Sequence, residues 1–131
     1  MNTKHLSFPL LLFVTVRLFL SLWAGIVVTL LPVQTEPNEV LRPYLGDPIL
    51  VKGVEGVTLG SWQRFDTQRY VRIAREGYVH EADSVFPPLY PLLIGGLGRV
   101  LNGRYLLAAL LISNSALLGL LILLHRVTAE W

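Results

Sequence analysis

The sequence predicts an all-α integral membrane protein, and three observations carry that prediction. Of its 131 residues, 53% are hydrophobic and only 15% are charged, whereas soluble domains carry about 25% charged residues. Two apolar segments, residues 6–33 and 105–125, are each long enough to cross a bilayer core, which takes about 20 helical residues. Residues 34–104 are more polar and rich in proline and glycine, which predicts a connecting loop with interfacial helices outside the bilayer.

Residues 6–33 form the first expected transmembrane helix. The segment contains one charge, Arg17, and Pro9 stands near its start, where a helix tolerates proline. It is longer than the apolar region of a secretory signal and lacks a small-residue cleavage site, so we expect a span and not a cleaved signal. A charge within a span is costly, and two roles stay open for Arg17: a functional role, or a structural ion pair.

The second apolar segment carries small residues at a spacing typical of packed membrane helices. Ala109 and Ser113 are four residues apart, as are Ser115 and Gly119, and this spacing lets helices approach closely. Asn114 lies between the two pairs and needs a hydrogen-bond partner inside the membrane. We therefore expect this helix to pack against other protein.

Two interfacial helices are expected in the loop. Apolar side chains at helical spacing predict an amphipathic helix near residues 61–77, which ends at Gly77. Residues 87–101 are uncharged up to Arg99 but too short to cross a bilayer, which favours a second helix lying in the interface. The basic residues of the loop, taken alone, favour a cytoplasmic loop under the positive-inside rule.

Asp66 is the first candidate for chemistry. It stands at the expected start of the first interfacial helix, among arginines and aromatic residues. A carboxylate within hydrogen-bond reach of a hydroxyl can remove its proton as a general base. The alternative is an aspartate that caps the helix, since the first turn favours a negative charge. The local sequence by itself favours the cap.

Four arginines near Asp66 are the second candidate. Guanidinium groups bind phosphate bidentately and would stabilise the anion that leaves a lipid-phosphate donor. The alternative is attraction to anionic lipid headgroups. Two of the four, Arg69 and Arg72, lie within two helical turns of Asp66 and are the preferred phosphate ligands. The full set is Arg64, Arg69, Arg72 and Arg75.

A short acidic cluster, His80, Glu81 and Asp83, precedes the second interfacial helix. Carboxylate oxygens suit a divalent cation, but the spacing is unspecific and a solvated loop is the preferred interpretation. No metal ligand and no cofactor are predicted, and a divalent cation stays an alternative. The chain has no cysteine for a disulfide or a thiolate site, and its net charge of +2 does not indicate a nucleic-acid partner.

Three motifs follow one another along the chain. They are W-x-x-x-D-x-x-x-Y-x-x-I-A-x-x-G-Y at residues 62–78, F-P-P-L-Y-P-L-L at residues 86–93 and L-L-I-S-N-S-A-L-L at residues 110–118. In this order they resemble the PIG-V type mannosyltransferases, the GPI mannosyltransferase 2 proteins and their bacterial relatives. The chain departs from the family pattern at Phe65, where tryptophan is usual, and at Arg69, where an aromatic residue or histidine is common.

The resemblance implies a GT-C fold, in which a polytopic helical enzyme holds its catalytic acid in the first non-cytoplasmic loop. The implied reaction is an inverting transfer of a sugar, usually mannose, from a polyprenyl- or dolichyl-phosphate donor to a hydroxyl of a lipid-linked or glycan acceptor. Asp66 matches the family's loop acid and is the expected general base. The expected donor-phosphate ligands are Arg69, Arg72 and Arg75, and the residues expected to shape the sugar pocket or anchor the interface are Trp62, Tyr70 and Tyr78.

The family is several hundred residues long, so the resemblance implies that residues 1–131 are the N-terminal part of such an enzyme and are inactive alone. The implied partners are the polyprenyl-phosphate sugar donor, membrane lipids and the remaining transmembrane helices. The resemblance also overrides the positive-inside rule. It implies a bacterial plasma membrane with the loop, residues 34–104, on the periplasmic side.

Two alternatives remain open. A small two-helix membrane interaction protein without catalytic activity would use its small-residue faces to bind a partner. A GT-C transferase of another sugar would share the same residues, and a donor assay would separate it from a mannosyltransferase.

Overall fold

The computed structural model describes residues 4–31, 56, 58–63 and 66–129. Most of the expected irregular stretch at residues 34–60, together with Arg64 and Phe65, lies outside these residues. Every element in the described part of the chain is helical, which confirms the predicted all-α class. The elements are α1 (Lys4–Leu30), η1 (Gly60–Trp62), α3 (Thr67–Glu76), η2 (Glu81–Val85), α4 (Leu89–Val100) and α5 (Tyr105–Ala129).

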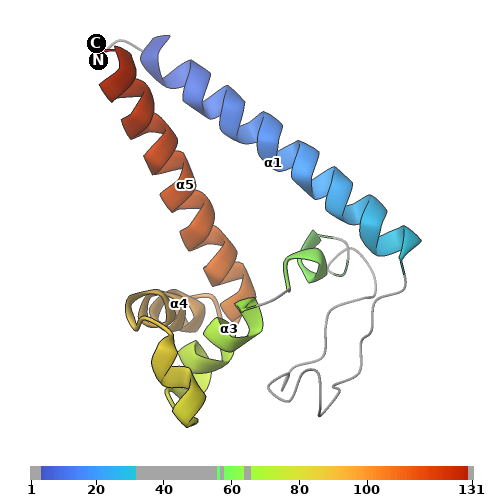
Figure 1. Ribbon diagram of the computed structural model, residues 1–131, viewed down its shortest axis with the longest axis vertical. Helices are drawn as coiled ribbons and strands as arrows, with labels where there is room; N and C mark the ends of the chain where they lie inside the picture. The colour runs from blue at the N-terminus through green and yellow to red at the C-terminus, as the bar shows by residue number, and fades with distance from the viewer. Residues whose placement is uncertain (1–3, 32–55, 57, 64–65, 130–131) are drawn as a thin grey trace.

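The helices α1 and α5 are long and apolar enough to cross a membrane. The qualifying stretches are Ser7–Val27, with a mean hydropathy of 2.2, and Tyr105–Thr128, with a mean hydropathy of 2.4. The two helices are antiparallel, with the N-terminal end of α1 beside the C-terminal end of α5 (Figure 1), where the rings of Phe8 and His125 lie 5.5 Å apart. Most of their apolar side chains are exposed, and such surfaces need a bilayer or further helices to cover them.

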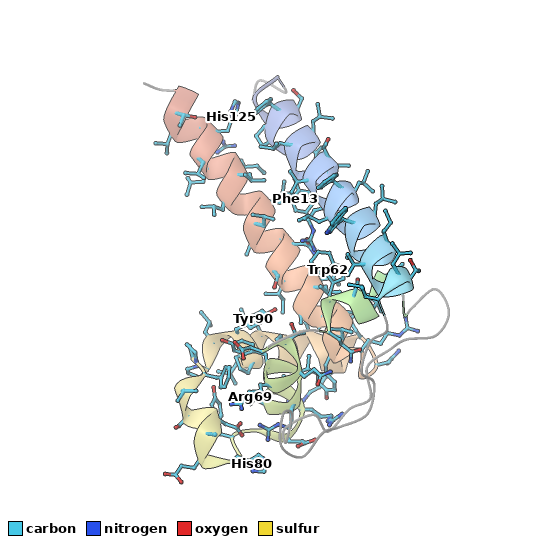
Figure 2. The ribbon with its side chains drawn as sticks, turned by 45° about the vertical axis from the view of Figure 1, so that its right-hand side comes forward. Phe13, Trp62, Arg69, His80, Tyr90 and His125 are labelled. Carbon is cyan, nitrogen blue, oxygen red and sulfur yellow. The ribbon has the colours of Figure 1, made fainter. Side chains whose placement is uncertain are left out.

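The short helices α3, η2 and α4 gather at the other end of α5, and α4 lies crosswise to α5 in both views (Figures 1 and 2). The centre of this cluster is formed by Ile94 of α4 and by Ala108 and Ala109 of α5, all fully or almost fully buried. The Tyr90 hydroxyl lies 3.2 Å from the Ala109 carbonyl oxygen and 2.7 Å from the Ser113 hydroxyl. These bonds fix α4 to the first turns of α5.

Small residues allow the helices of this cluster to approach closely. At Gly95 of α4, a Cβ atom would lie 2.9 Å from the carbonyl oxygen of Ala74 in α3. Beyond α4, Asn102 and Gly103 have φ angles of 54° and 83°, which turns the chain sharply into α5. In α5, the Asn114 side chain donates a hydrogen bond to the Leu110 carbonyl at 2.7 Å. The expected need of Asn114 for a partner is therefore met within its own helix.

We expect Gly95→Ala to destabilise the helical cluster. The added methyl group would press on the backbone of α3, and overpacking costs about 1–3 kcal/mol, against up to about 1 kcal/mol from better helix propensity. The measurement is the free energy of unfolding of the full chain in detergent micelles. Gly96→Ala is the matched control, because a Cβ atom there meets nothing within 4 Å. Equal stability of the two variants would contradict the close approach of α3 and α4.

Candidate functional site

Asp66 lies at the N-terminal end of α3 and is exposed. Its carbonyl oxygen accepts the Tyr70 N–H at 3.0 Å, but its carboxylate makes no cap hydrogen bond. Its backbone angles of −73° and −9° are helical, whereas a capping side chain normally requires an extended residue. The structure therefore does not support the capping role, and within the described part of the chain the carboxylate has no ion-pair partner.

Arg17 of α1 lies over the ring of Trp62 in η1, with its guanidinium carbon 4.4 Å from the ring centroid. Figure 2 shows Trp62 beside α1. This cation–π contact joins the first long helix to the segment that precedes Asp66. No acid of the described residues forms an ion pair with Arg17, so the structural ion pair considered for it is not found among them.

Arg72 of α3 forms a buried ion pair with Asp83 of η2. The other carboxylate oxygen of Asp83 accepts the backbone N–H of His80 at 3.0 Å, which closes the short η2 turn. The expected solvated loop is therefore wrong for Asp83, which is fully buried, although Glu81 is exposed. Tertiary packing causes this burial, because the long Arg72 side chain reaches from α3 to Asp83 in the turn.

The environment of Asp83 keeps it ionised. Burial alone raises the pKa of its carboxyl group, but the hydrogen bonds from the His80 backbone and the Arg72 guanidinium, with the nearby positive charge, outweigh burial and lower the pKa below 3.8. In the described segments, no three His, Cys, Asp or Glu residues are grouped as a metal site would require. Asp83 therefore acts as a structural counter-ion for Arg72.

Aromatic rings pack against one another where α3 meets α4 and the segment before it. The ring of Tyr70 lies 5.0 Å from those of Phe86 and Tyr90, in edge-to-face arrangements. Arg69 lies over the Phe86 ring at 5.4 Å, and the Tyr78 hydroxyl donates to the Phe86 carbonyl at 2.8 Å. Tyr70 and Tyr78, which were expected to shape the sugar pocket or anchor the interface, thus lie in contacts that pack the helices around Phe86.

The expected phosphate ligands do not converge on one point. Arg75 pairs with Glu76 at 2.7 Å near the C-terminal end of α3, nine residues from Asp66 and therefore about 14 Å away along the helix axis. Arg72 is held by Asp83, and Arg69 by the Phe86 ring among its contacts. The three guanidinium groups are thus distributed over different contacts along the helix.

One polar feature was missed by the sequence analysis. Gln68 lies one turn before Arg72, both residues are buried, and several of their side-chain polar atoms lack a hydrogen-bond partner. The four-residue spacing, which puts both on one helix face, was the available signal. Buried polar groups without partners are costly, so these atoms suit a polar ligand or water. The atoms are Gln68 Nε2 and Oε1 and Arg72 Nε and Nη1.

We expect Asp83→Asn to lower the free energy of unfolding by about 3–5 kcal/mol, because Arg72 would remain buried without a counter-ion. Glu81→Gln, an exposed acid in the same turn, is the control and should change it little. In the parent protein, the ionised Asp83 carboxylate contributes fully to the free energy of unfolding above a pH of 3.8, its ordinary pKa. This contribution is lost as the pH falls through the lower pKa of the folded state. Chemical unfolding measured over this range tests both statements, and a wild type and Asp83→Asn with the same pH dependence would contradict them.

Comparison with known proteins gave no matching family model, no similar curated protein and no similar solved structure. The function of the chain is therefore inferred from its residues and their geometry.

Proposed function

We propose that this chain is part of a membrane glycosyltransferase of the GT-C type, in which Asp66 is the general base. The proposed reaction moves a sugar, with mannose as the expected one, from a polyprenyl-phosphate donor to a hydroxyl group. The observation that carries the proposal is the exposed carboxylate of Asp66, which has no partner in the described part of the chain although three arginines follow it on α3.

The contacts of those arginines explain how the carboxylate stays available. Arg72 is paired with Asp83, Arg75 with Glu76, and Arg69 lies over an aromatic ring. A carboxylate neutralised by an arginine would be a poor base, since the adjacent positive charge favours its ionised form. The proposed general base is thus followed in sequence by the three arginines of α3 but forms no ion pair with them.

The Arg17–Trp62 contact supports a lipid-linked phosphate as the donor. Arg17 lies inside the apolar stretch Ser7–Val27, and its guanidinium has an aromatic face as its described contact and no acid. A donor phosphate that reached Arg17 would provide the missing negative charge, and guanidinium groups bind phosphate well. Trp62 stands four residues before Asp66, so the same segment carries the proposed base and the aromatic residue expected to stack on sugar.

In the proposed step, the acceptor hydroxyl gives its proton to a carboxylate oxygen of Asp66 while its own oxygen bonds to the anomeric carbon of the sugar. The bond from that carbon to the phosphate oxygen breaks, and polyprenyl phosphate leaves with the electron pair. Arg17 is the proposed stabiliser of this anion. Attack opposite the leaving group inverts the anomeric configuration.

A second candidate function is a membrane interaction protein without catalysis. The exposed apolar sides of α1 and α5 favour it, because they offer large surfaces for helices of another protein. Under either function, we propose a location in a membrane. The bacterial plasma membrane with a periplasmic loop belongs to the transferase proposal.

Asp66→Asn, in the protein encoded by the whole reading frame, is expected to lower sugar transfer at least about 100-fold, the lower range for loss of a general base. The measurement is transfer of labelled mannose from polyprenyl-phosphate mannose in isolated membranes. Glu76→Gln, an exposed acid at the opposite end of α3, is the control and should retain activity. Undiminished transfer by Asp66→Asn would overturn the proposed role.

Arg17→Gln is expected to raise the KM for the polyprenyl-phosphate donor and to lower kcat as well, because the proposed contact is to the donor phosphate both when it is bound and as it leaves. Arg126→Gln, which removes an exposed arginine near the far end of α5, is the control. A lower kcat at unchanged KM would contradict a donor-binding role for Arg17.

A further inference from the structure

A hollow of about 320 Å³ lies between the C-terminal half of α3 and the middle of α4. Two successive glycines of α4 line it: a Cβ atom at Gly95 would lie 2.9 Å from the Ala74 carbonyl oxygen of α3, whereas a Cβ atom at Gly96 would meet nothing within 4 Å. Its apolar surface is formed mainly by Ile73, Ala74, Pro91, Leu92, Gly95 and Gly96.

The charged groups around the hollow leave a positive charge without a partner. Arg75 lines it together with Glu76, and these two form an ion pair at 2.7 Å. Arg99, on the α4 side, is exposed, and its guanidinium has no hydrogen bond or ion pair in the described part of the chain. The hydroxyl of Tyr78, which also lines the hollow, is bonded to the Phe86 carbonyl. The uncompensated charge is therefore that of Arg99.

The hollow adjoins an apolar surface of α4. Leu89, Leu92 and Val100 are 68%, 69% and 76% exposed, and they share one side of the helix with Gly96. Because α4 lies crosswise to α5 and packs on its first turns, it would run along the membrane boundary if α5 crosses a bilayer (Figures 1 and 2). An apolar helix face next to a basic residue is typical of helices that lie in this layer.

We propose that this hollow binds the phosphate headgroup of an anionic phospholipid. The Arg99 guanidinium donates hydrogen bonds to the phosphate, and the acyl chains cover the exposed leucines of α4. A lipid fits better than a free phosphate, because the apolar wall at Leu92 leads directly from the hollow to the outer face of α4. The inference rests on the membrane location proposed above, but not on sugar transfer.

The test uses the full chain in a neutral detergent, mixed with equal amounts of phosphatidylglycerol and phosphatidylcholine. Native mass spectrometry counts the lipid molecules of each kind that remain bound. We expect the wild type to prefer phosphatidylglycerol and Arg99→Gln to lower that preference about fivefold, the effect of one basic residue at a lipid surface. Gly96→Phe, which fills the hollow from a position with open space, should lower it as well.

Arg104→Gln is the matched control, since Arg104 is exposed on the neighbouring turn but does not line the hollow. Equal losses in the Arg99 and Arg104 variants would overturn the site in favour of general surface attraction. Displacement of the lipid by excess glycerol phosphate would overturn the lipid as occupant and indicate a soluble phosphate ligand. A wild type without lipid preference would also overturn the site. The mannose transfer assay is a separate measurement, so none of these results bears on the proposed transferase activity.

Discussion

The buried ion pair between Arg72 and Asp83 is the interaction on which the helical cluster depends. It joins α3 to η2, eleven residues later in the chain, across a turn that contains Gly77 at a φ angle of 86°. By fixing η2, it fixes the start of the segment that leads to Phe86 and α4. A buried ion pair adds less to stability than its strength suggests, because both charges lose their hydration. We infer that its main effect here is to select one arrangement of α3 against η2.

The position of Phe86 follows from that arrangement. Its ring contacts Tyr70 and Arg69 of α3, and its carbonyl accepts the Tyr78 hydroxyl. These contacts engage residues that the sequence suggested for substrate binding. They also hold Arg69 and Arg72 in contacts with other groups. The same packing that builds the cluster therefore leaves the Asp66 carboxylate without a neutralising neighbour among the residues that the structure describes.

Local sequence properties were sufficient to predict the long helices but not the contacts between elements. The apolar segments at residues 6–33 and 105–125 overlap α1 and α5, because length and hydropathy can be measured along the chain. The burial of Asp83 could not be predicted, since its acidic neighbours and its loop position are typical of a solvated residue. The unpaired groups of Gln68 also depend on tertiary burial. The mannosyltransferase roles of the site residues stay predictions from the motif.

Tyr90 and Arg17 each connect a shorter element to a long helix, and their contacts differ in kind. Tyr90 anchors α4 to α5 through hydrogen bonds to Ala109 and Ser113, which have a defined direction and length. Arg17 joins α1 to η1 by its position over an aromatic face, and such a contact tolerates sliding and tilting. The segment before Asp66 is therefore tied to α1 less rigidly than α4 is tied to α5. In the proposed transferase, this difference would let the Arg17–Trp62 side adjust to a lipid-linked donor while the α4–α5 side remains fixed.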